Sequence, residues 1–149
     1  MKKRLLVISC SKRKSRAGGL LPAIERYTGA WYGVINKLRR EDELPQNLDI
    51  VIISARYGFL RASKLIEYYN LRMTEERAKE LNPQIINGFR SLLNDNHYEA
   101  VFINLGKDYM PAIKGFDKIL PPDTKVYHAK GRVGERKSQM KKWILSSCV

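Results

Sequence analysis

The sequence predicts a three-layer, Rossmann-like α/β sandwich built on a four-stranded, mainly parallel sheet. Two observations predict this class: short apolar runs recur along the chain, and segments with helical spacing of apolar residues lie between them. Nearly continuous apolar runs are typical of strands that are buried on both faces, as in parallel sheets. Alternation of strand and helix places helices on both faces of such a sheet. Because 149 residues fit one domain, we expect residues 1–149 to form a single α/β domain.

Four segments have the composition of strands. They are short, rich in Val, Ile and Leu, and bounded by polar or turn-forming residues. The first three hold few polar residues, so we expect them to be buried on both faces of the sheet. The predicted strands cover 4–9, 49–55, 99–105 and 125–129.

The segments between these strands carry apolar residues every three or four positions, a spacing that is typical of amphipathic helices. In the longest segment this spacing places Ala78, Leu81 and Phe89 on one stripe. Thr74 is the expected cap of that helix, and Pro83 is expected to divide or kink it. The predicted helices cover 30–41, 74–95, 107–119 and 132–145.

The charge is strongly positive and unevenly distributed. Lys and Arg number 28 against 15 Asp and Glu, which gives a net charge of +13. Residues 1–16 carry seven cations and no acid, and residues 125–142 carry seven cations and the single acid Glu135. A surplus of this kind is typical of proteins that bind a polyanion. We therefore expect nucleic acid, either DNA or RNA, or a nucleotide as the partner.

Cysteine and histidine are scarce. Two Cys and two His occur, and none has a companion at metal-ligand spacing, so we expect neither a metal site nor a cofactor. No apolar run approaches the roughly 18–20 residues that span a bilayer. The apolar part of the basic N-terminus is too short for a signal peptide. We therefore expect a cytoplasmic protein with no membrane partner.

Small, basic and aromatic residues follow each predicted strand. In parallel α/β sheets, ligands bind at the carboxyl ends of the strands, so these segments predict one positive rim. Their candidate roles are contacts with phosphate, sugar or base. The candidate binding residues are Ser9, Ser11, Lys12, Lys14, Ser54, Tyr57, Gly58, Tyr69, Gly106, Lys107, Tyr109, Lys130, Gly131, Arg132 and Arg136.

The stretch "SCSKRK" after the first strand lacks the glycine spacing of a P-loop. Small residues beside lysines can still present backbone N–H and ammonium groups to a phosphate. A solvated basic turn is the alternative. Tyr57 or Tyr69 is expected to stack on a base, and a packed tyrosine with one wet edge is the alternative.

Two residues are candidate catalytic groups. Cys10 lies among cations, which lower the pKa of a thiol and favour a nucleophile, and a buried structural thiol is the alternative. Glu135 is the leading candidate for a general acid or base. A salt bridge with the flanking Arg132 and Arg136 is the alternative for Glu135.

Several motifs resemble known families. The stretch 52–73 resembles the peroxide-stress YaaA-like family, in which a strand runs into a Ser-x-x-Tyr-Gly-x-Leu turn. The whole chain resembles a small uncharacterised family of bacterial, archaeal and phage proteins with a Cys-Ser-x-x-Lys opening, a Tyr-Thr-Gly step, a Ser-Ala-x-Tyr-Gly turn and a late Gly-x-x-Gly-Glu-Arg. These motifs stand here as Cys10–Ser11–Lys14, Tyr27–Thr28–Gly29, Ser54–Ala55–Tyr57–Gly58 and Gly131–Gly134–Glu135–Arg136.

A fainter similarity links Cys10 and Lys14 to the Pro-Cys-x-x-x-Lys region of archaeosine synthase, whose domain resembles uracil-DNA glycosylases in fold. These resemblances imply a nucleic-acid or nucleobase site at the strand ends, and action on a nucleobase or an N-glycosidic bond. Two other functions stay open. One is an enzyme on a small nucleotide or phosphorylated substrate, and the other is a non-catalytic protein that docks on RNA.

Overall fold

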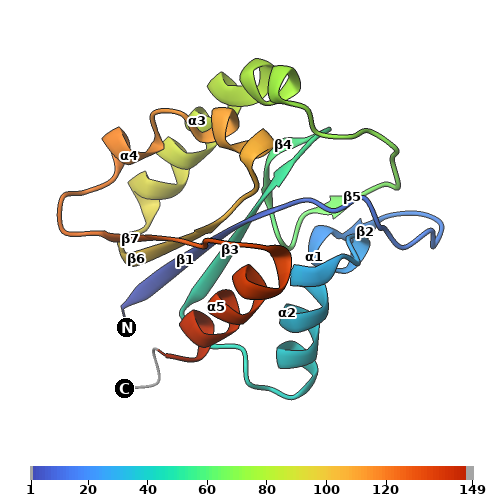
Figure 1. The fold of residues 1–149 in the computed structure, drawn as a ribbon, viewed down its shortest axis with the longest axis horizontal. Coiled ribbons are helices and arrows are strands. Elements are labelled where there is room, and N and C mark those ends of the chain that lie inside the picture. The colour runs from blue at the N-terminus through green and yellow to red at the C-terminus, as the bar shows by residue number, and fades with distance from the viewer. Residues whose placement is uncertain (1, 147–149) are drawn as a thin grey trace.

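A five-stranded sheet forms the centre of the protein (Figure 1). The computed structural model describes residues 2–146. Four strands run parallel and the fifth pairs antiparallel at one edge. The mainly parallel α/β class and the four predicted strands are confirmed, each within one residue of its predicted bounds. The order across the sheet is β4 (Gly58–Arg61), β3 (Leu48–Ser54), β1 (Lys3–Ser9), β6 (Tyr98–Asn104) and β7 (Lys125–His128).

The edge strand β4 is a correction to the predicted four-stranded sheet. The sequence analysis placed this segment in a turn after the second strand, and the turn itself covers only residues 55–57. Gly58 then starts β4 with φ +70°, a conformation that side chains other than glycine rarely adopt. Four residues are too few to show the alternation of an exposed edge strand, so the sequence gives little sign of it.

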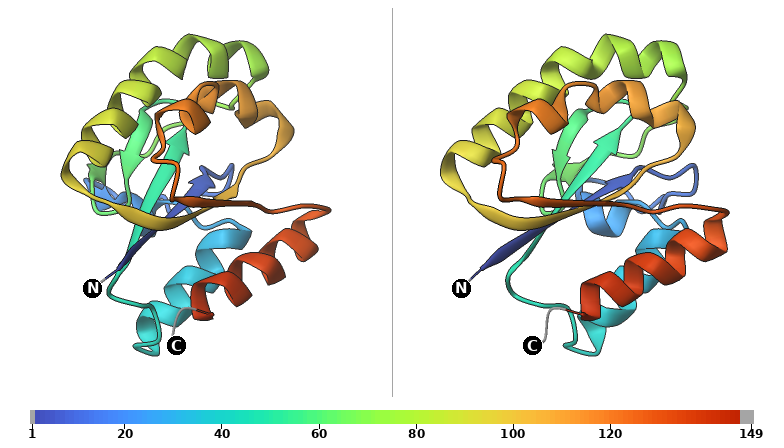
Figure 2. Two further views of the ribbon diagram at one scale, coloured as in Figure 1. Left: turned by 90° about the vertical axis from the view of Figure 1, so that its left-hand side faces the viewer. Right: turned by 60° about the vertical axis from the view of Figure 1, so that its left-hand side comes forward.

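Helices cover both faces of the sheet, which confirms the three-layer arrangement (Figure 2). One face is covered by α1 (Ala23–Arg26), α2 (Ala30–Arg40) and α5 (Val133–Leu145). The other carries α3 (Glu75–Asp95), the 3₁₀ helix η1 (Lys107–Ile113) and α4 (Phe116–Ile119). The predicted helix over 107–119 is thus two short helices, because Gly115 between them has φ +92° and breaks the helical conformation.

Helix α3 follows its predicted pattern closely. The Thr74 side chain accepts a hydrogen bond from the backbone N–H of Arg77 (3.1 Å) and caps the helix. The predicted stripe, including Ala78 and Phe89, is buried against the sheet. Pro83 lies inside the helix and does not divide it. A proline in a helix interior costs about 3 kcal/mol, and burial of the apolar stripe offsets this cost.

The centre of the core is β1, whose residues Leu5 to Ile8 are fully buried between the two helical layers. Neighbouring strands β3 and β6 are buried in the same way over most of their length. Among residues 2–146, every helix falls short of the length and apolarity that a membrane-spanning segment needs.

The topology creates a crevice between β1 and β6. The chain leaves β1 toward α1 and α2 on one face, whereas it leaves β6 toward η1 on the opposite face. Two adjacent parallel strands whose connections diverge in this way leave an opening at their carboxyl ends, which is where ligands bind in open α/β sheets.

A small antiparallel ribbon lies beyond the carboxyl ends of the strands, and the sequence did not predict it. It pairs β2 (Leu21–Pro22) with β5 (Leu65–Ile66), on the right in Figure 1. The side chain of Arg26 is fully buried beside the ribbon. Its guanidinium donates to the carbonyls of Ser15 and Ala17 (both 2.9 Å), Gly19 (2.6 Å) and Ile66 (3.2 Å). Arg26 therefore fixes the loop over residues 15–19 to the body of the protein.

Candidate functional site

A pocket opens at the crevice between the carboxyl ends of β1 and β6. Its volume is about 440 Å³. Three segments line it: the turn after β1, the extended stretch before α3, and the start of η1 after β6. The lining residues are Cys10, Ser11, Lys12, Lys14, Asn70, Leu71, Arg72, Met73, Asp108 and Tyr109. We call this the carboxyl-end pocket.

The thiol of Cys10 lies against the phenol of Tyr109 in this pocket. The sulfur and the hydroxyl oxygen are 3.1 Å apart, and the same hydroxyl lies 3.3 Å from the carbonyl oxygen of Cys10. Burial raises the pKa of the Tyr109 phenol, and the nearby Cys10 raises it further. Tyr109 therefore stays protonated at neutral pH and has a proton to donate beside the thiol.

Three buried hydroxyls lie under the pocket and satisfy one another. The hydroxyl of Tyr27 is 3.0 Å from that of Ser54 and 2.7 Å from that of Tyr69, and Ser54 and Tyr69 are 3.1 Å apart. Burial raises the pKa of both phenols. The triangle is therefore neutral and fixes both rings beneath Lys14.

Lys14 lies over these rings. Its ammonium nitrogen is 4.5 Å from the ring centre of Tyr69 and 5.9 Å from that of Tyr27. Within the described chain, no carboxylate oxygen lies within the 4.0 Å of an ion pair with it, and its polar contact is the carbonyl oxygen of Lys12 at 3.4 Å. Burial lowers the pKa of the Lys14 ammonium, and the nearby Cys10 partly offsets this. A half-desolvated cation without a counter-ion is suited to an anionic ligand.

The turn that carries Lys14 is bound to the start of α2. The hydroxyl of Ser11 accepts from the N–H of Gly29 (3.2 Å), and the N–H of Thr28 donates to the carbonyl of Arg13 (3.1 Å). A Cβ atom at Gly29 would lie 2.6 Å from the Cβ of Ser11. The Tyr27–Thr28–Gly29 step is thus the support of the turn, because only glycine permits this approach.

A second cation, Arg136 of α5, lies at the carboxyl end of β6. The guanidinium of Arg136 lies 4.9 Å from the ring centre of Trp31 and 3.4 Å from the side-chain oxygen of Asn104 at the end of β6. Burial lowers the pKa of Arg136, yet a guanidinium stays charged in proteins. Trp31 in turn donates to the hydroxyl of Ser9 (3.1 Å). Arg136 therefore adds positive charge at the end of β6.

The structure brings together Cys10, Ser11, Lys12, Lys14 and Tyr109 of the predicted site residues. Three other predicted residues lie beneath the pocket instead of on its rim, and we correct their placement. Ser9 and Ser54 are buried, and their hydroxyls are occupied by Trp31 and by the tyrosine triangle. Tyr69 is only 5% exposed, with Lys14 over its ring and the edges of Tyr27 and Tyr57 against it. Its ring is thus not open to a base.

The predicted residues around β4 and η1 have local structural contacts. Tyr57 packs edge-on against Tyr69 and lies under Arg56, 5.1 Å from its guanidinium. Gly58 starts β4, where the amide of Gln84 would collide with any added Cβ. Gly106 caps η1 and Lys107 begins it. These residues border the crevice, and none of them lines the carboxyl-end pocket.

The predicted residues after β7 lie apart from this pocket. The carboxylate of Glu135 accepts from the backbone N–H of Arg132 (3.2 Å) and closes the first turn of α5. Gly131 has φ +96°, and a Cβ there would lie 2.8 Å from that carboxylate. Backbone atoms of Lys130 bond to the side chain of Gln139. The structure therefore gives Glu135 a capping contact, and the two arginines beside it form no ion pair with it within the described residues.

Several residues of the site were not predicted as site residues. They are Tyr27, Trp31, Asn70, Met73 and Asp108, together with Arg72. Tyr27 was noted only as part of a motif, and its buried hydroxyl was not visible in the sequence. The stretch 70–73 has no regular structure, so no periodicity points to it. Asp108 stands directly beside two predicted residues, Lys107 and Tyr109, and that position was the available signal.

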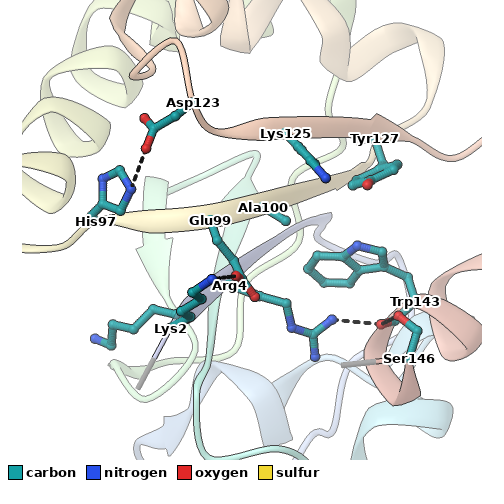
Figure 3. Close-up of a pocket in the computed structure, with 11 residues that line it drawn as sticks. Lys2, Arg4, His97, Glu99, Ala100, Asp123, Lys125, Tyr127, Trp143 and Ser146 are labelled. Carbon is teal, nitrogen blue, oxygen red and sulfur yellow. Dashed lines mark hydrogen bonds and ion pairs between the residues drawn. The ribbon is translucent and has the colours of Figure 1, made fainter. Parts of the chain in front are cut away.

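A second groove, of about 640 Å³, lies at the opposite end of the sheet (Figure 3). There most of the charged groups are paired, whereas Lys125 has no ion pair among the described residues. Lys2 lies 3.9 Å from Glu99, His97 lies 3.2 Å from Asp123, and Arg4 donates to the last carbonyls of α5. We call this the amino-end groove.

Comparison with known proteins gives a family and a fold. The model of DUF6884, a family of unknown function, matches residues 5–142, so the chain belongs to this family. The crystal structure of AF0587, a protein of unknown function, is similar with a TM-score of 0.58 and 12% sequence identity. That likeness covers 96% of this chain and 44% of AF0587, so the chain spans less than half of that protein. No curated protein matches the sequence.

Proposed function

We propose that this protein binds nucleic acid, and that the carboxyl-end pocket holds one nucleotide unit of it. The observation that carries this proposal is Lys14, a partly buried cation that forms no ion pair among the described residues, although the carboxylate of Asp108 lines the same pocket. Lys12 and Arg72 line the same pocket. Three cations around one opening, in a protein of net charge +13, favour a phosphate-bearing ligand.

The size and lining of the pocket suit a single nucleotide. Ligand pockets commonly have about 300–1,000 Å³, and about 440 Å³ accommodates one nucleotide but no duplex. The lining includes the cations Lys12 and Arg72 and the apolar residues Leu71 and Met73. A phosphate on the cations and a base on the apolar side would use both. A polymer would then enter as a single strand or as an extruded nucleotide.

The motif resemblances support the same proposal. The Cys10 to Lys14 stretch is the one that resembles the openings of the peroxide-stress YaaA-like family and of the archaeosine synthase domain, and it lies at the pocket. Those resemblances imply a uracil-DNA-glycosylase-like ancestry and a nucleobase ligand, and we include both in the proposal.

A second candidate function, chemistry on the bound nucleotide, is favoured by the contact between Cys10 and Tyr109 (3.1 Å). In release of a base, the sulfur would bond to the sugar carbon as the bond from carbon to base nitrogen breaks. The Tyr109 hydroxyl would protonate the leaving base and take up the thiol proton of Cys10 in exchange. Water would then hydrolyse the sulfur–carbon bond, giving its hydroxyl to the sugar and a proton to the sulfur. If this is correct, Cys10→Ser keeps nucleotide binding and loses base release. Base release that persists in Cys10→Ser would remove the thiol from the mechanism.

Fluorescence anisotropy tests the binding proposal directly. Labelled single-stranded DNA, single-stranded RNA, duplex DNA and a mononucleotide are titrated with the wild type and with Lys14→Met. Charged hydrogen bonds are worth about 1.5–3 kcal/mol, so Lys14→Met should weaken binding of the single strands and the mononucleotide by about 10- to 100-fold. For single strands the logarithm of affinity should fall with the logarithm of salt by about 0.7 per phosphate contacted.

Lys125→Met is the matched control, because Lys125 is an exposed lysine in the amino-end groove. It removes the same charge from the protein without touching the carboxyl-end pocket. Equal losses in Lys125→Met and Lys14→Met would show a diffuse charge effect and overturn the assignment of the pocket. Absence of measurable binding to every probe would overturn the proposed function itself.

A further inference from the structure

Two of the three segments that line the carboxyl-end pocket, the turn after β1 and the stretch before α3, lie next to each other where they leave the pocket. Lys14 is followed by the loop 15–19, and Asn70 is preceded by Tyr68. The guanidinium of Arg16 lies 5.4 Å from the ring centre of Tyr68. Between these segments is a shallow depression of about 410 Å³, lined by Arg16, Ala17, Gly18, Gly19, Glu67 and Tyr68. Figure 1 shows both segments on the same side of the molecule, beyond β2 and β5.

Exposed apolar side chains gather along these segments. Of the eight large apolar side chains that are exposed in the described chain, four belong here: Leu20, Leu65, Tyr68 and Leu71. Single exposed apolar residues are normal on a surface, but half of those in the described chain stand on these two segments, near the polar residues Arg16 and Glu67. We call Arg16, Tyr68 and this apolar group the flanking surface.

Adjacent tyrosines have opposite environments here. Tyr69 is 5% exposed and belongs to the buried triangle, whereas Tyr68 is 39% exposed and pairs with Arg16. An exposed tyrosine with a guanidinium on its ring is the arrangement that stacks on bases of single strands. The sequence motif of two tyrosines thus separates into a support, Tyr69, and a stacking candidate, Tyr68.

The loop that carries Arg16 is held in place before any ligand arrives. Arg26 bonds to three of its carbonyls and to Ile66 on the other segment. This cross-link fixes the two sides of the flanking surface relative to each other. A surface that is already ordered loses less conformational entropy on binding.

We propose that the flanking surface binds the nucleotide next to the one in the carboxyl-end pocket, so that the ligand is a single strand of at least two nucleotides. The inference rests on the proposed function and extends it from a nucleotide to a polymer. Tyr68 stacks on the second base and Arg16 contacts the backbone phosphate. Lys14 and Arg16 are two residues apart, about 7 Å in extended chain, which is a span that successive phosphates of a single strand can match.

The test compares a short single strand with a mononucleotide. Wild type, Tyr68→Ala and Arg16→Ala are titrated with a labelled eight-nucleotide strand and with a labelled mononucleotide. Stacking on an aromatic ring is worth about 1–3 kcal/mol per base, so Tyr68→Ala should weaken strand binding by about 5- to 100-fold. Mononucleotide binding should stay within about twofold of the wild type, because the carboxyl-end pocket is unchanged. Tyr127→Ala is the matched control, since Tyr127 is also exposed but lies on β7.

Failure of this inference differs from failure of the proposed function. If Lys14→Met weakens both ligands while Tyr68→Ala changes strand binding no more than Tyr127→Ala, the proposed function stands and the flanking surface does not bind the strand. If the strand binds no more tightly than the mononucleotide, the flanking surface is likewise overturned. If Lys14→Met changes neither ligand, the proposed function fails. Thermal unfolding of each variant confirms that the fold is retained in every comparison.

Discussion

The two ends of the central sheet carry similar numbers of cations, but these cations have different partners at each end. At the amino end, Lys3 bonds to Asp49 (3.1 Å) and Asn96 (2.7 Å), and Lys2 and His97 face carboxylates. At the carboxyl end, Lys12, Lys14 and Arg72 line one pocket with no ion pair between them and a described carboxylate. Paired charges need no ligand, whereas gathered and unpaired charges repel one another. Net charge alone could not make this distinction.

Two buried arginines give the largest expected effects. Arg4 ties β1 to the end of α5 at the amino end, with bonds to the carbonyls of Trp143 (2.7 Å) and Ile144 (2.8 Å). Arg26 ties the loop 15–19 at the carboxyl end. Each substitution, Arg4→Met and Arg26→Met, leaves buried carbonyls without a donor and should lower the free energy of unfolding by about 3 kcal/mol or more. Urea unfolding measures this loss.

The same two substitutions also compare the two ends of the sheet in strand binding. Below the unfolding transition, Arg26→Met should lose strand binding because the loop that carries Arg16 loses its anchor. Arg4→Met should keep binding, because its contacts lie at the far end of the sheet. Equal binding by both variants would mean that the carboxyl end needs no fixed loop, and the contrast between the ends would then be one of charge alone.

Substitution of Lys3 and of Lys14 should change the free energy of unfolding by smaller amounts and in opposite directions. Lys3→Met removes the cationic partner of Asp49, a mostly buried carboxylate that also accepts from the Tyr98 hydroxyl, and should lower the free energy of unfolding by about 1 kcal/mol. Lys14→Met removes a desolvated cation without a counter-ion, so it should leave the fold as stable as the wild type or more so. Only Lys14→Met should lose nucleotide binding. Urea unfolding and anisotropy on the same two variants test both halves, and a destabilised Lys14→Met would contradict the unpaired state of this lysine.

The sequence predicted which residues lie at the carboxyl ends of the strands. Apolar runs located β1 and β6, and the rule for parallel sheets then placed Cys10, Lys14 and Tyr109 at one opening. It named Tyr69 and not Tyr68 as a stacking residue, because one residue of phase decides which ring enters the core and the segment has no regular period. The sequence named Glu135 as the leading candidate for a general acid or base, with a salt bridge to the flanking arginines as the alternative. Its position at the start of α5 instead gives its carboxylate a backbone N–H partner. Contacts between distant segments, such as Gly29 against Ser11, need the fold before they can be seen.

The pH dependence of binding is a further and weaker test. In the free protein burial lowers the pKa of Lys14, whereas a bound phosphate would favour the charged form and raise it. As the pH rises through the lowered pKa, the free protein loses this proton and binding has to restore it, so affinity should fall by up to about tenfold per pH unit. The decline should begin below the range of an ordinary lysine, whose pKa is about 10.4.

Lys14→Arg should flatten this profile, because a guanidinium stays protonated throughout. Anisotropy titrations of the mononucleotide from about pH 6 to about pH 10 on both proteins provide the measurement. A wild-type profile that is as flat as that of Lys14→Arg would show that Lys14 keeps an ordinary pKa, and the desolvation argued for this lysine would then be wrong. Stability has the opposite sign: the cost of holding Lys14 charged in the fold is present at low pH, and the free energy of unfolding rises as the pH rises from the lowered folded pKa toward the ordinary pKa of the unfolded chain.

The smallest expected effect belongs to an exposed ion pair of the amino end. The side chains of Lys2 and Glu99 are 85% and 39% exposed and lie 3.9 Å apart, and exposed pairs of this kind contribute about 0–1 kcal/mol. Glu99→Gln should therefore change the free energy of unfolding by less than about 0.5 kcal/mol and should not change nucleic-acid binding at the salt concentration used for the other variants. Freeing Lys2 near Lys125, which already has no ion pair among the described residues, is thus a direct test of whether unpaired charge is sufficient for binding. If Glu99→Gln creates binding comparable with that of the carboxyl end, the buried hydroxyls, the fixed loop and the shape of the pocket add nothing to the charge, and the contrast between the two ends loses its basis.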